Sequence, residues 1–207
     1  MWAIAGLLSA LFLGIYDIFK KTSLTGNAVL PVLFFATLTS TTIFLPVVVG
    51  SWFFPDTFSA IGLYSPTLSF NQHMQVFLKS AIVVSSWILA FFAMKHLPVT
   101  IFSPIRATGP FWTLIGAIAI FHEKLNLMQW CGVLITLLFF YLFSTTGKKE
   151  GIEFKSNKWI WFIVAGTLLG SVSGLYDKFI IAIIDRIAVQ AWFSFYQVVI
   201  LFPVLAI

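Results

Sequence analysis

The chain has 207 residues, of which 60% are hydrophobic and 9% charged, with a net charge of +5. A soluble domain carries about 25% charged residues, so this composition excludes a water-soluble globular fold. The single cysteine, Cys131, cannot form an internal disulfide, and the sequence has no nucleotide-binding loop and no metal-ligand spacing among its three histidines. We therefore expect no cofactor and no metal.

Seven apolar segments are long enough to cross about 30 Å of hydrocarbon as helices. They lie near 1–19, 28–54, 76–94, 97–121, 125–145, 159–184 and 187–207. None shows the roughly 10-residue alternating segments of a β-barrel, and backbone groups in lipid must pair internally, which leaves helices. The predicted fold class is all-α integral membrane.

Two polar stretches interrupt the apolar segments. Residues 53–72 are expected to form an interfacial loop, whereas 148–157 is the only strongly charged linker. We predict a first five-helix unit over 1–147, the charged linker over 148–157, and the start of a second unit over 158–207.

The two units share a repeated helix. Residues 5–19 align with 165–179 at an offset of 160, and both copies contain the string Gly-x-Tyr-Asp-x-Phe. Because an odd number of spans separates the two starts, the copies enter the membrane from opposite sides. This predicts an inverted repeat, which is typical of secondary transporters with a site near the midplane.

The offset also predicts how much of the second unit is present. A complete second copy would end roughly 100 residues beyond Ile207. We therefore expect ten helices in the whole protein, with about seven in these residues, and we do not expect this stretch alone to transport.

A loose set of residues follows the third predicted span: Ala93-x-x-x-Leu97-Pro98, Pro110, Glu123-x-Leu125 and Gln129-x-x-Gly132. This set resembles the second part of an EamA repeat of the drug/metabolite transporter superfamily. The resemblance covers the first unit and the helices present from the second. It implies a ten-helix exporter or exchanger of metabolites, built from two inverted five-helix units, with an acidic residue recurring at the position of Glu123.

Small residues form a stripe on both copies of the repeated helix. In the first copy they are Gly6, Ala10 and Gly14, followed by Asp17, and in the second they are Gly166, Gly170 and Gly174, followed by Asp177. Each set lies on one helical face. The stripe is either a seam for close helix packing or a face that leaves room for a solute.

The repeated Asp and Tyr residues are candidates for gates. An intramembrane carboxylate is costly and usually faces a partner, water or cargo. Since Asp17 and Asp177 lie near helix ends, inverted symmetry favours gates at opposite membrane faces, with snorkelling toward solvent as the alternative. Tyr16 and Tyr176 are either hydrogen-bonding gate residues or interfacial anchors.

Arg106 lies about nine residues, or ~13 Å, into the fourth predicted span. Pro104, Gly109 and Pro110 flank it and loosen the helical hydrogen-bond ladder. We hypothesise that Arg106 pairs with Asp17 in the empty protein and binds an anionic group of a substrate. A purely structural pairing is the alternative.

The distribution of basic residues predicts the orientation. Loops after the first, third and fifth spans hold Lys20, Lys21, Lys95, Lys148, Lys149, Lys155 and Lys158. Lys79, Lys124 and Arg186 are assigned to the opposite face. The first set is expected to be cytoplasmic, which places the N-terminus outside.

The leading hypothesis is a secondary transporter in the cell membrane that moves a small metabolite or drug-like solute by alternating access, in export or exchange. A non-transporting assembly or sensor subunit and an intramembrane lipid-modifying enzyme are the alternatives. The expected partners are the lipid bilayer and a small-molecule solute, with no nucleic acid. Proton coupling through Asp17 or Asp177 and homodimer formation are left open.

Overall fold

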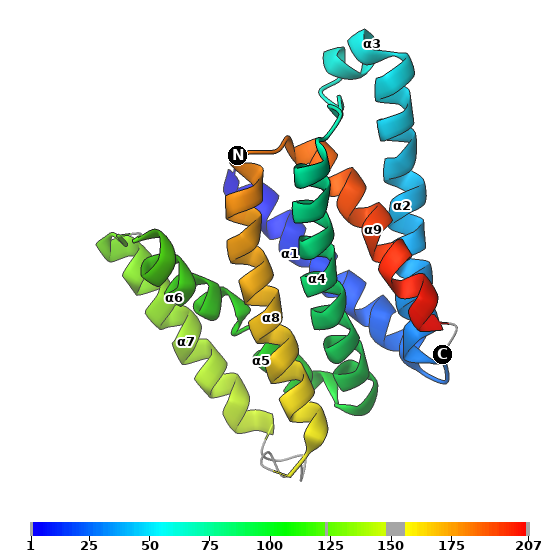
Figure 1. The fold of residues 1–207 in the computed structure, drawn as a ribbon. Coiled ribbons are helices and arrows are strands. Elements are labelled where there is room, and N and C mark those ends of the chain that lie inside the picture. The colour runs from blue at the N-terminus through cyan, green and yellow to red at the C-terminus, as the bar shows by residue number, and fades with distance from the viewer. Residues whose placement is uncertain (1, 123, 148–155, 206–207) are drawn as a thin grey trace.

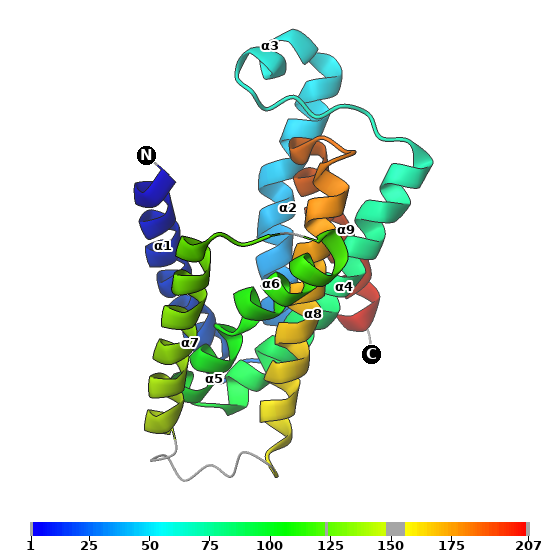
Figure 2. The same cartoon turned by 90° about the vertical axis from the view of Figure 1, so that its left-hand side faces the viewer.

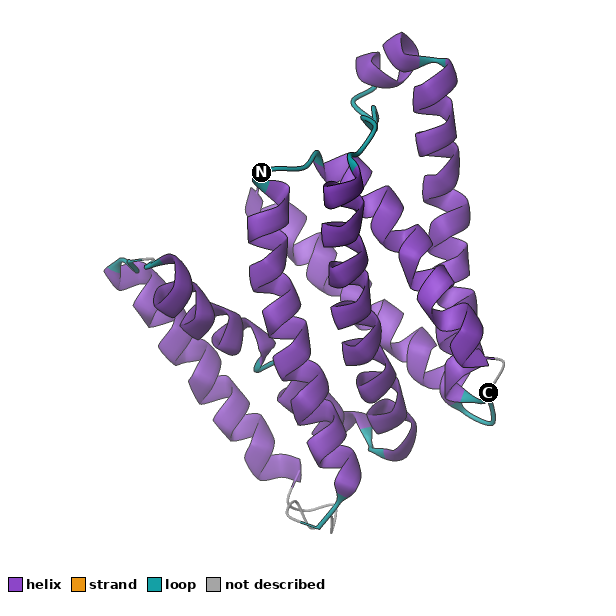
Figure 3. Cartoon of the chain, viewed as in Figure 1, coloured by secondary structure: helices purple, strands orange, loops and turns teal. Residues whose placement is uncertain are grey.

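The computed structural model describes residues 2–122, 124–147 and 156–205, and Glu123 and most of the charged linker lie outside this part. Within it the chain forms helices and no strands, so the all-α prediction is confirmed (Figure 3). The helices are α1 (Trp2–Leu24), α2 (Val29–Phe53), α3 (Pro55–Ala60), α4 (Phe70–His96), α5 (Val99–Arg106), α6 (Gly109–Phe121), α7 (Leu127–Gly147), α8 (Lys158–Ile181) and α9 (Arg186–Leu205).

Among the described residues, five segments are long and apolar enough to cross a membrane: α2, α4, α5 together with α6, α8, and α9. The other two predicted spans correspond to α1 and α7, and α7 contributes a shorter apolar helix over Leu127–Phe139. The chain is therefore a multi-pass membrane protein. In Figure 1, α1 and α8 run in opposite directions, as an inverted repeat requires, although the repeat itself stays a prediction.

Two helices extend beyond their predicted limits. α1 continues to Leu24 and includes Lys20 and Lys21, which the prediction had assigned to a loop. α4 begins at Phe70, where a capping box joins the Ser69 side chain to the Gln72 backbone and the Gln72 side chain to the Ser69 backbone. Lys79, which the predicted span 76–94 placed near its start, therefore lies well inside α4.

The fourth predicted span is broken in the middle. α5 ends at Arg106 and α6 begins at Gly109, with Ala107 and Thr108 between them. Pro104 and Pro110 each remove a backbone N–H from the ladder, so the helix loses continuity where both act. The break places Arg106 at the end of a half-helix.

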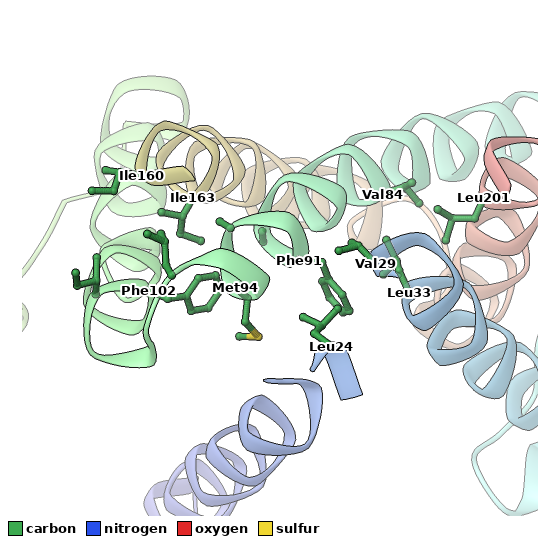
Figure 4. Packing of buried hydrophobic residues seen from close by; sticks show 14 residues of the cluster. Leu24, Val29, Leu33, Val84, Phe91, Met94, Phe102, Ile160, Ile163 and Leu201 are labelled. Atoms are coloured by element: carbon green, nitrogen blue, oxygen red, sulfur yellow. The ribbon is translucent and has the colours of Figure 1, made fainter. Parts of the chain in front are cut away.

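The core is built around α4, which packs mainly against α8 and α9, while α2 packs against α9. One buried apolar cluster joins the C-terminal half of α4 to α2, α5 and α8, and includes Phe91, Met94, Phe102 and Ile163 (Figure 4). A second cluster, which includes Val76, Ile180 and Phe193, joins the N-terminal half of α4 to α8 and α9. Figure 2 shows α1 and α7 on one side of this central group.

Candidate functional site

A cavity of about 820 Å³ lies between α4, α6 and α8, with α5 and the start of α9 completing its wall. Ligand pockets commonly have volumes of about 300–1,000 Å³, so a metabolite-sized solute fits. Of the described residues, the charged ones in its wall are Lys79, Arg106 and Asp177. Hydroxyl groups, Gln190 and the rings of Trp87 and Phe193 form other parts of the wall.

The small residues of α8 form one side of this cavity. A Cβ on Gly166 would lie 3.0 Å from the Ser86 carbonyl oxygen, so α8 approaches α4 closely there. The Ser86 hydroxyl also donates to the Gly166 carbonyl at 2.7 Å. Gly170 and Gly174 face the cavity next to this seam, and a Cβ on Gly174 would meet Thr113 at an ordinary 3.6 Å. The α8 stripe therefore packs at one end and leaves room at the other.

The matching residues of α1 lie in a different environment. A Cβ on Gly6 or Gly14 would meet nothing within 4 Å among the described residues. The packing that a small-residue seam predicts is thus absent at these two positions in that part of the chain, because α1 lies at the periphery. The same sequence pattern is used for packing in one copy only.

The broken helix contributes the opposite side of the cavity. The first residues of α6, Gly109 and Pro110, line the cavity. The N-cap residue, Thr108, makes no side-chain hydrogen bond to the start of this helix. The Gly109 carbonyl accepts hydrogen bonds from Ser171 at 2.9 Å and from Thr113 at 3.1 Å. Since helix N-termini carry a partial positive charge, the start of α6 favours negative charge in the cavity.

Asp177 forms an ion pair across the cavity wall. Its Oδ1 lies 2.5 Å from the Nζ of Lys79 on α4. The Lys79 ammonium also sits over the Phe193 ring, 4.4 Å from its centroid. The lysine side chain is buried, whereas that of the aspartate is 34% exposed. Asp177 thus has a partner from a different helix.

Asp17 is paired within its own helix. Its Oδ1 lies 2.7 Å from the Nζ of Lys20, which also sits over the rings of Tyr16 and Phe91. Within the described residues, no ion pair joins Arg106 to Asp17, so the predicted pair does not form. The reason is proximity along the sequence, because Lys20 is only three residues from Asp17 and reaches it on the same helical face.

The tyrosines of the repeat are also separated. Tyr16 lines a second cavity of about 730 Å³ between α1 and α2, together with Lys20 and Phe91. Tyr176 packs against the apolar cluster at the N-terminal end of α4 and stacks on Phe179, with ring centroids 6.0 Å apart. The structure therefore gathers Arg106, Asp177 and the α8 glycines at one cavity, and places Tyr16 and Lys20 at another.

The residues of the larger cavity that sequence reasoning missed include Lys79, Gln190 and Phe193. The capping box at Ser69 and Gln72 was a readable signal for Lys79, since it moves the helix start back to Phe70 and so places this lysine deeper in the span. The sequence carries no comparable signal for Gln190 or Phe193, because their roles depend on how α9 packs.

Comparison with known proteins assigns the family. Residues 1–145 match the model of the EamA-like transporter family. No curated protein matches the chain. The matched residues make up more than half of the 207 and include α1 to α6 and most of α7. Members of this family are transporters rather than enzymes. The chain thus belongs to the EamA-like transporter family, and this membership implies a membrane transporter of small solutes.

Proposed function

We propose that this protein is a secondary transporter of the cell membrane, which binds a small metabolite or drug-like solute in the cavity between α4, α6 and α8. One observation carries the proposal: in a chain of this family, a solute-sized cavity with three charged side chains lies among membrane-spanning helices. Charged residues within a membrane are costly and usually mark a substrate or ion pathway. The cavity also lies beside a discontinuous helix, a common feature of transporter sites.

Transport by alternating access, in export or exchange, is the mechanism that we propose. The cavity is bounded by helices of both predicted units, with α4, α5 and α6 from the first and α8 and α9 from the second. A relative movement of the units would therefore change the access to the bound solute. Proton coupling through Asp177 or Asp17 would provide the driving force, since a carboxylate in such a pathway can bind and release a proton.

A flux assay tests this proposal. The full-length protein is reconstituted into liposomes, and uptake of a metabolite panel is measured with and without a pH gradient, with protein-free liposomes as the control. We expect saturable uptake of at least one compound, and loss of that uptake in Arg106→Ala. Normal uptake by Arg106→Ala would remove the binding role of Arg106. An absence of flux for every compound would instead favour a sensor or assembly subunit.

A further inference from the structure

The wall of the larger cavity has an excess of positive charge. Among the described residues, Lys79 and Arg106 contribute two cations to the wall and Asp177 contributes one carboxylate, which leaves a net charge of +1 for this part of the chain. Arg106 forms no ion pair with any carboxylate of the described residues. Because an unpaired charge away from bulk water is unfavourable, the cavity favours an anion over a neutral or cationic solute.

The free hydrogen-bond donors of the cavity are concentrated on a few side chains. The hydroxyl groups of Ser86, Thr113, Thr167 and Ser171 already donate to backbone carbonyls of the helices. Within the described part of the chain, the Arg106 guanidinium and the side chains of Gln190, Ser173 and Trp87 make no hydrogen bond to protein. The Lys79 ammonium has three N–H groups, of which Asp177 does not need all. A ligand recognised here therefore has to supply acceptors.

The Lys79–Asp177 pair is asymmetric in its burial. The Lys79 side chain is 8% exposed and is held against Phe193, whereas the side chain of Asp177, which also lines the cavity, is 34% exposed. A second carboxylate entering the cavity would have the same chemistry as Asp177. It can therefore take the place of Asp177 while the lysine stays where it is, and the Asp177 side chain turns toward the open part of the cavity.

We propose that the solute is an organic anion, whose carboxylate replaces Asp177 as the partner of Lys79, with Arg106 as the second cation. Asp177 is then the internal counterion of the empty cavity. Trp87 and Phe193 provide the apolar surface for the rest of the ligand. This inference rests on the proposed function, because it names the chemical class of the transported solute.

Three probes of similar shape test the charge preference. Binding of benzoate, benzamide and benzylamine to the purified protein in neutral detergent is measured by calorimetry. We expect benzoate to bind about tenfold or more tightly than the other two, because each of them lacks the anionic acceptor. Equal or tighter binding of benzamide or benzylamine would overturn the inference.

Variants of the pair test the exchange of counterions. Lys79→Gln is expected to weaken benzoate binding about tenfold, whereas Lys79→Arg should retain it. Asp177→Asn is expected to strengthen it about threefold or more, because the internal competitor for Lys79 is removed. A gain in affinity cannot result from misfolding, and unchanged or weaker binding in Asp177→Asn would contradict the inference.

Matched controls are available on the same helices. Lys95 is an exposed lysine of α4 outside the cavity, and it donates to the Asn27 carbonyl at 2.8 Å. Arg186 starts α9 and also lies outside the cavity. Lys95→Gln and Arg186→Gln should bind benzoate as the unchanged protein does. If Lys95→Gln lost as much affinity as Lys79→Gln, the effect would be one of overall charge and the proposed site would be wrong.

The outcomes separate this inference from the proposed function. Flux of neutral or cationic solutes without any binding of benzoate would contradict the anion site and leave the transport proposal standing. Benzoate binding with the expected response of the variants, but with no flux of any organic anion in liposomes, would contradict transport and leave the anion site standing.

Discussion

The two copies of the repeated helix, α1 and α8, have similar sequences and very different surroundings. α8 buries Ile160, Ile163 and Ile180 against its neighbours. α1 exposes most of its apolar side chains, including Phe12 at 66% and Phe19 at 68%. The shared Gly-x-Tyr-Asp-x-Phe string therefore does not by itself determine a site. Its role depends on which helices lie next to it.

The aspartates of the two copies show this dependence directly. Asp17 has Lys20 three residues away as its partner. The position that corresponds to Lys20 in α8 is occupied by Ile180, which is fully buried in the core. Asp177 therefore has no cation at that position of its own helix and pairs with Lys79 of α4 instead. The change from Lys20 in the first copy to Ile180 in the second thus leaves Asp177 to pair with a residue of the cavity wall.

The largest difference that we expect between the copies is in packing. Gly166→Leu would place side-chain atoms against the Ser86 carbonyl and is expected to destabilise the protein by about 1–3 kcal/mol through overpacking. Gly14→Leu is the matched control and should have little effect, because nothing lies within 4 Å of its Cβ position in the described part of the chain. Thermal unfolding in detergent measures both.

If Gly14→Leu destabilised the protein as strongly as Gly166→Leu, α1 would be packed in the membrane as closely as α8. The difference in packing that we infer between the two copies would then be wrong.

A smaller difference is expected between the two ion pairs. The Lys79–Asp177 pair joins two helices and should have a coupling energy of about 1 kcal/mol, less than a fully buried pair because the aspartate is partly exposed. The Asp17–Lys20 pair lies within one helix. That helix persists when the helices separate in the membrane, so the pair should contribute only about 0.2–0.5 kcal/mol to stability.

Double-mutant cycles measure these coupling energies. The first combines Lys79→Gln with Asp177→Asn, and the second combines Lys20→Gln with Asp17→Asn. A larger coupling in the second cycle would show that the local pair holds α1 to the rest of the protein, contrary to this account.

The helices were predictable because the apolar segments are long and the bilayer fixes their length. Their ends were less predictable, since Lys20 looks like a loop residue and Lys79 like a residue near a helix end when polarity alone is used. Both are buried inside helices, where an aspartate and aromatic rings compensate their charge. The break between α5 and α6 was predictable, because Pro104 and Pro110 weaken the helical hydrogen-bond ladder there.

The cavity was only partly predictable. Arg106, Asp177, Gly170 and Gly174 stand out in the sequence through charge in an apolar span or through the repeat, and all of them line it. Their partners could not be derived, because the pairing of α4 with α8 depends on tertiary packing and not on spacing along the chain. The predicted pair between Arg106 and Asp17 was wrong for a local reason, because Lys20 lies three residues from Asp17 and pairs with it instead.

The central claim is that the cavity between α4, α6 and α8 is a water-accessible solute site within the membrane. Thiol labelling tests it most directly, in a Cys131→Ser background and with a charged, membrane-impermeant methanethiosulfonate. Thr113→Cys faces the cavity, and Ile115→Cys is the control on the same helix, at similar depth and outside the cavity. Only a thiol in contact with water ionises and reacts readily. We predict rapid labelling at position 113 and little at 115. Equal labelling at both positions, or none at position 113, would contradict the account.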